Sequence, residues 1–116
     1  MNGGNGGSVS GRPSHAVGFQ ALANLITGPN NDAEGSVALG YNAGTSVTYG
    51  GGNILLGYQA GVANTTGGSN TLLGYKSGIA LTTGANNIII GDDVSSVNSL
   101  ISGSGNIIIG SGISAT

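Results

Sequence analysis

Side chains that carry out catalysis are scarce in this chain of 116 residues. His15 is the only histidine, cysteine is absent, and Arg12 and Lys76 are the only other cationic candidates. Nucleophilic catalysis needs a nucleophile, a base and a group that orients the base, and a serine–lysine pair would depend on Lys76 alone. We therefore predict that the chain is not an enzyme, has no catalytic residues and binds no cofactor. We expect His15 to pack or cap at an inward-facing position.

The acidic pair Asp92-Asp93 has the chemistry of a cation ligand, but it stands alone in the sequence. Calcium takes about six to eight oxygen ligands, and no further pattern of oxygen ligands accompanies these two carboxylates. The absence of cysteine also excludes thiolate metal sites and disulfides. We therefore predict no metal site.

Charge and hydropathy exclude two further classes of function. Charged residues make up 5 % of the chain and the net charge is −2, so the basic stripe that nucleic-acid binding requires is absent. Uninterrupted apolar runs are too short to span a bilayer. We therefore predict neither nucleic-acid binding nor membrane insertion.

A short phrase recurs along the chain: three residues that are mostly apolar, then glycine, then usually an aromatic residue. Successive copies of the glycine are 22, 17, 17, 17 and 19 residues apart. A fixed period repeated this often predicts a solenoid, and a helical alternative is unfavourable because glycine recurs in every segment. The repeated glycines are Gly18, Gly40, Gly57, Gly74, Gly91 and Gly110.

The apolar residues before each glycine predict one short strand in every repeat. The positions one and three residues before the glycine share one face of the strand, and the middle position faces the other way. All three positions are mostly apolar, so both faces need cover. A single coil covers only its inner face, and we expect a second copy of the chain to cover the middle column. The predicted core and oligomer columns contain Val37, Leu39, Ile54, Leu55, Leu56, Leu72, Leu73, Ile88, Ile89, Ile90, Ile107, Ile108 and Ile109.

Two further columns suggest ladders of stacked side chains. Asn53, Asn70, Asn87 and Asn106 precede successive strands, which indicates either an internal amide ladder or a polar binding stripe. The position after the glycine forms an aromatic column, which indicates either packing or a stripe that stacks on sugars or other surfaces. Its members are Phe19, Tyr41, Tyr58 and Tyr75.

These patterns predict an all-β fold, namely a parallel β-roll or β-solenoid of about six rungs with a period of about 17 residues. Residues 1–13 are expected to form a flexible lead-in rich in glycine, asparagine and serine, and residues 14–116 the repeat domain. Paired threonines at Thr65-Thr66 and Thr82-Thr83 form only a small array, so we give an ice-binding surface little weight.

Three segments resemble known repeats. Ser36–Ala43 resembles the head repeats of trimeric autotransporter adhesins. Asn70–Gly78 and Thr82–Asn87 are similar to related repeats of bacteriophage tail fibres and other virion proteins. The resemblance implies a left-handed parallel β-roll assembled as an intertwined or side-by-side homotrimer, with apolar strands around the three-fold axis. The repeat of 17 residues is longer than the adhesin repeat.

The leading hypothesis is a non-enzymatic structural module of a phage virion: a tail-fibre or spike segment, or a small fibre or decoration protein. Its expected partners are two further copies of the chain, other virion proteins and a host-surface glycan or protein. The first alternative is a fragment of a bacterial surface adhesin head that binds host matrix or cells at the bacterial surface. The start at Met1 without a segment typical of a signal peptide favours the virion. The second alternative is a subunit that stacks end to end into a filament.

Overall fold

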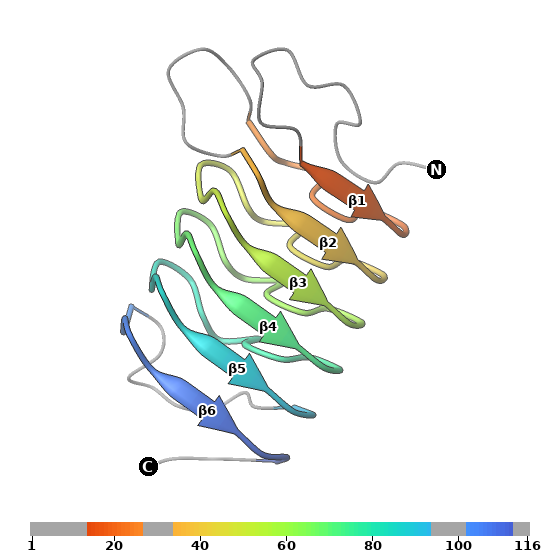
Figure 1. The fold of residues 1–116 in the computed structure, drawn as a ribbon. Helices are drawn as coiled ribbons and strands as arrows, with labels where there is room; N and C mark the ends of the chain where they lie inside the picture. The colour runs from red at the N-terminus through yellow and green to blue at the C-terminus, as the bar shows by residue number, and fades with distance from the viewer. Residues whose placement is uncertain (1–13, 27–33, 94–101, 113–116) are drawn as a thin grey trace.

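A computed structural model describes residues 14–26, 34–93 and 102–112. Within these residues the chain forms six short parallel strands in one sheet and no helix, and the strand order follows the sequence. Figure 1 shows the six arrows stacked side by side, with the chain coiling back between them. The prediction of an all-β parallel solenoid with a period near 17 residues is confirmed, with about four complete turns. The strands are β1 (His15–Val17), β2 (Val37–Leu39), β3 (Ile54–Leu56), β4 (Thr71–Leu73), β5 (Ile88–Ile90) and β6 (Ile107–Ile109).

Each rung lies in register with the next, so equivalent residues stack along the solenoid. Ile54 of β3 pairs with Val37 of β2 and with Thr71 of β4. Backbone hydrogen bonds also join the rungs away from the sheet. For example, the Gly61 N–H donates to the Ser77 carbonyl at 2.9 Å. This arrangement satisfies backbone donors and acceptors along most of each turn, as burial requires.

The repeated glycine ends each strand because no other residue fits there. Gly57 has a φ of 138°, a conformation that side chains oppose sterically. A Cβ atom on Gly57 would also collide with the Gly74 carbonyl oxygen of the next rung. The glycine column therefore sets both the sharp corner and the close approach of neighbouring rungs.

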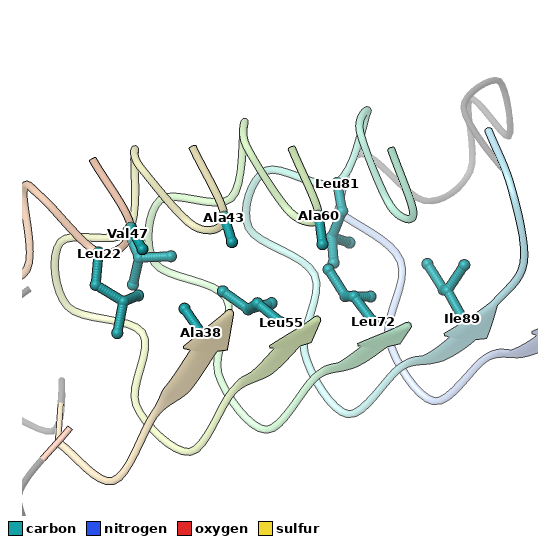
Figure 2. Close-up of a cluster of buried hydrophobic side chains, with 10 residues drawn as sticks. Leu22, Ala38, Ala43, Val47, Leu55, Ala60, Leu72, Leu81 and Ile89 are labelled. Atoms are coloured by element: carbon teal, nitrogen blue, oxygen red, sulfur yellow. The ribbon is translucent and has the colours of Figure 1, made fainter. Parts of the chain in front are cut away.

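The hydrophobic core lies inside the coil, between the strands and the opposite wall of each turn. In Figure 2 the middle strand residues Leu55, Leu72 and Ile89 point away from the sheet toward that wall. All three are fully buried. The opposite wall contributes smaller residues and a few large ones, namely Ala21, Leu22, Ala43, Val47, Ala60 and Leu81.

The predicted orientation of the strands was wrong. We expected the middle column to need a second chain, yet Ala38, Leu55, Leu72 and Ile89 fill the interior of their own coil. The flanking columns face outward instead, and His15 is exposed with them rather than inward-facing. The alternation of a strand fixes which residues share a face, but it does not say around which face the connecting chain will coil. The expected lead-in, residues 1–13, lies outside the described residues.

Candidate interaction surfaces

The outer face of the sheet is apolar and open to solvent in the single chain. We call the residues one and three positions before the repeated glycines the outer sheet face. Ile54 is 41 % exposed, whereas its middle-column neighbour Leu55 is fully buried, and Ile107 of the last strand is 72 % exposed. No aspartate, glutamate, lysine or arginine occurs in these columns. The outer sheet face consists of His15, Val17, Val37, Leu39, Ile54, Leu56, Thr71, Leu73, Ile88, Ile90, Ile107 and Ile109.

This face is a large uncovered apolar surface for so small a protein. Its seven most exposed aliphatic side chains together keep in water roughly the surface of three to four complete side chains. Burial of one such side chain contributes about 1.5–3 kcal/mol, so covering the face would contribute on the order of 5–10 kcal/mol. Monomeric soluble proteins rarely expose contiguous apolar patches of this kind.

The aromatic column forms a stacked ladder at the carboxyl ends of the strands. The ring centroids of Tyr41 and Tyr58 are 5.2 Å apart, as are those of Tyr58 and Tyr75, and Phe19 lies 5.5 Å from Tyr41. The interplanar angles are 10–13°, so the inner rings turn their faces toward each other and leave mainly their edges accessible. Lys76 covers the last ring, with its Nζ 5.3 Å from the Tyr75 centroid.

The asparagine column runs through the interior, at the amino ends of the strands. Asn53, Asn70 and Asn87 are fully buried, so their amides are not accessible to a ligand. The backbone N–H of Asn70 donates to the Asn53 Oδ1, and that of Asn87 donates to the Asn70 Oδ1, each at 3.0 Å. The Asn70 Nδ2 donates to the Gly84 carbonyl at 2.9 Å. Direct amide-to-amide bonds occur from Asn87 to Asn70 and from Asn106 to Asn87.

One buried amide was missed in the sequence. Asn64 is fully buried and closes the turn at Gly67: its Oδ1 accepts from the Gly67 N–H at 3.1 Å, and its Nδ2 donates to the Gly67 carbonyl at 2.9 Å. Equivalent positions in the neighbouring rungs hold Val47 and Leu81. Because the column is otherwise apolar, no sequence signal marked this residue.

The remaining sequence candidates do not assemble a site. Asp92 and Asp93 are exposed, and the described part of the chain contains no group of three or more potential metal ligands. The Thr65 Oγ1 donates to the Thr82 carbonyl at 3.2 Å, and the Thr48 Oγ1 donates to the Thr65 carbonyl at 3.3 Å. These hydroxyls therefore bond to the adjacent rung.

A groove of about 540 Å³ lies where the turns lead into β2, β3 and β4. The sequence pattern does not mark this groove, because its floor consists of glycines from two adjacent rungs. The groove is mostly polar, with one aromatic ring at its side. Its lining residues are Glu34, Gly35, Tyr49, Gly50, Gly51, Gly52, Thr66, Gly68 and Ser69.

Comparison of the chain with protein-family models, with curated proteins and with solved structures finds no significant match to any of the three. Function is therefore inferred from the surfaces described above. A search of the described residues for a helix long and apolar enough to cross a membrane finds none.

Proposed function

We propose that the chain is a non-enzymatic structural module that assembles with copies of itself through its outer sheet face into a rigid, projecting homotrimer. The observation that carries this proposal is the largely apolar face on six stacked strands, exposed in the single chain while the middle column already fills the coil's own interior. In this assembly the three sheets face a common axis, and the coils point outward.

A second copy of the same chain is the partner that fits this face best. Parallel strands stack at about 4.8 Å, so a partner with the same rung spacing can match side-chain rows along the whole length of the sheet. The scarcity of charge, with a net −2 over 116 residues, leaves little repulsion between copies. Seven aliphatic side chains of this face are more than a third exposed in the single chain, and their burial against other copies would contribute on the order of 5–10 kcal/mol.

The internal structure suits a role in rigidity and projection. Hydrogen bonds join successive rungs on the sheet side and on the opposite wall, and buried amides bind the turns from inside. None of these contacts is an ion pair between exposed groups, so salt should weaken them little.

The setting that we propose is a phage virion, as a segment of a tail fibre or spike or as a small fibre or decoration protein. This placement depends on the similarity of Asn70–Gly78 and Thr82–Asn87 to repeats of phage tail fibres and other virion proteins. The alternative setting is an adhesin head at the bacterial surface, whose repeats Ser36–Ala43 resembles, and flanking genes distinguish the two settings. Virion neighbours favour the fibre, whereas a signal peptide and an anchor domain favour the adhesin.

The test is the solution mass of the intact chain by light scattering, with negative-stain microscopy of the same sample. We expect the mass of three chains and short rods. The variant Ile54→Lys places a charge at the centre of the outer sheet face and should yield a folded monomer, because burial of an unpaired charge is costly. Thr83→Lys, at an exposed position away from that face, is the matched control and should keep the mass of the parent. A folded parent that is monomeric at every concentration would overturn the proposal.

A further inference from the structure

The groove beside β2–β4 arises from a local gap in one column of side chains. Glu34, Gly51, Gly68 and Ala85 occupy equivalent positions in successive rungs. The N–H groups of Gly52 and Ser69 donate to the carbonyls of Glu34 and Gly51, at 2.9 and 2.8 Å. Two successive glycines leave this column without side chains between a glutamate and an alanine. The result is a hollow with a backbone floor.

The side chains around this hollow combine an aromatic ring with hydroxyl and carboxylate groups. Tyr49 lines one side and is 52 % exposed. Unlike the rings of the aromatic ladder, it makes no ring stack with another aromatic residue in the described part of the chain, because Thr66 occupies its column in the next rung. Thr66 and Ser69, which carry hydroxyl groups, and Glu34, which carries a carboxylate, also line the groove.

We propose that this groove binds a short segment of a neutral oligosaccharide. A pyranose ring has an apolar face that can lie on an aromatic ring, and hydroxyls at its edge that exchange hydrogen bonds with hydroxyl and carboxylate groups. Tyr49 supplies the stacking surface, and Thr66, Ser69 and Glu34 supply polar groups beside it. The volume of about 540 Å³ lies within the range of about 300–1,000 Å³ typical of small-ligand sites.

The negative charge at the groove restricts which sugars can bind there. Among the described residues that line the groove, Glu34 is the only charged one, and the chain as a whole is acidic. Sulfated and uronic-acid sugars would face repulsion here, which leaves neutral sugars as the fitting class. The groove lies at the amino ends of the strands and the aromatic ladder at their carboxyl ends, so this site goes beyond the proposed assembly and does not depend on it.

The experiment is a titration of the isotope-labelled intact chain with maltohexaose and, separately, with cellohexaose, followed by backbone amide chemical shifts. We expect millimolar binding of at least one of these neutral sugars, with shifts at Tyr49, Gly51, Gly52 and Ser69. Tyr49→Ala should weaken the binding about tenfold or more. Such a change corresponds to a loss of about 1.4 kcal/mol, as expected when a stacking ring is removed.

The matched control is Tyr75→Ala, because Tyr75 is an equally exposed tyrosine (49 %) at the opposite end of the strands. Its affinity for the sugars should equal that of the parent. The amide spectrum of each variant reports whether the fold is intact. Absence of shifts in the groove with both sugars would overturn the proposal, as would shifts centred on the aromatic ladder or equal weakening by the two tyrosine variants. The solution mass tests the proposed assembly independently of these results.

Discussion

The two sides of the sheet are built from the same kinds of residues but lie in opposite environments. Within β3, Leu55 is fully buried in the coil, while Ile54, its neighbour in sequence, is 41 % exposed. The inner side is covered by the chain's own turns, which bring Ala43, Ala60 and Val47 over the strands (Figure 2). The outer side has no such cover within the described residues. Both sides of the sheet therefore carry residues that favour burial, but a single chain covers only the inner side.

Replacement of a residue on the inner side should cause the largest loss of stability. Leu72→Ala opens a cavity in the centre of the core, and we expect it to lower the free energy of unfolding by about 2–5 kcal/mol. Leu73→Ala, the next residue on the outer side and only partly buried, is the matched control. Urea denaturation of both variants at low and equal protein concentration measures the difference. Equal losses in dilute solution would contradict the assignment of inner and outer sides.

Replacement of a buried asparagine should cause the next largest loss of stability. Asn70→Ala removes the acceptor for the Asn87 N–H and the donor to the Gly84 carbonyl, which leaves buried polar groups without partners. We expect a loss of about 3 kcal/mol, since each such group costs about 1–3 kcal/mol. The same denaturation series measures it, with the exposed Thr83→Ala as control. A loss no larger than that of the control would show that the ladder contributes little to stability.

The aromatic ladder should contribute less, and its inner rings more than its ends. Tyr58 stacks on two rings and Tyr75 on one. At about 0.5–1.5 kcal/mol per aromatic pair, Tyr58→Ala should cost about 1–3 kcal/mol and Tyr75→Ala about half as much. Thermal unfolding followed by circular dichroism compares the two variants. A greater loss for Tyr75→Ala would mean that its contact with Lys76 outweighs a ring stack.

The smallest effect on the isolated protomer should come from the outer sheet face. Leu39→Ser changes a side chain that is 52 % exposed. In dilute solution its free energy of unfolding should stay within about 0.5 kcal/mol of the parent. If copies associate through this face, the parent's Tm rises with protein concentration, and Leu39→Ser reduces that dependence. Calorimetry over a series of concentrations measures both quantities. A parent Tm that is independent of concentration would contradict self-association.

Much of the fold could be predicted because a repeat imposes its own geometry. The glycine column determined where strands end, since a residue such as Gly57 combines a positive φ with close backbone contact. Three further features follow from the repeat. Each strand starts three residues before that glycine, the strands run parallel in sequence order, and the period is about 17 residues. The candidate sites could be predicted less well. The asparagine and aromatic columns could be recognised in the sequence, but Asn64 and the groove at Tyr49 could not.

The sequence by itself determined the period, the strand positions and the two faces of each strand, because these depend on local sterics and on the alternation of side chains. Only the tertiary structure decided which face became the core. That choice depends on the path of the turn, which brings Ala60 and Leu81 over the middle column. The tertiary structure also created the groove, because the absence of side chains at Gly51 and Gly68 leaves a hollow only once successive rungs stack.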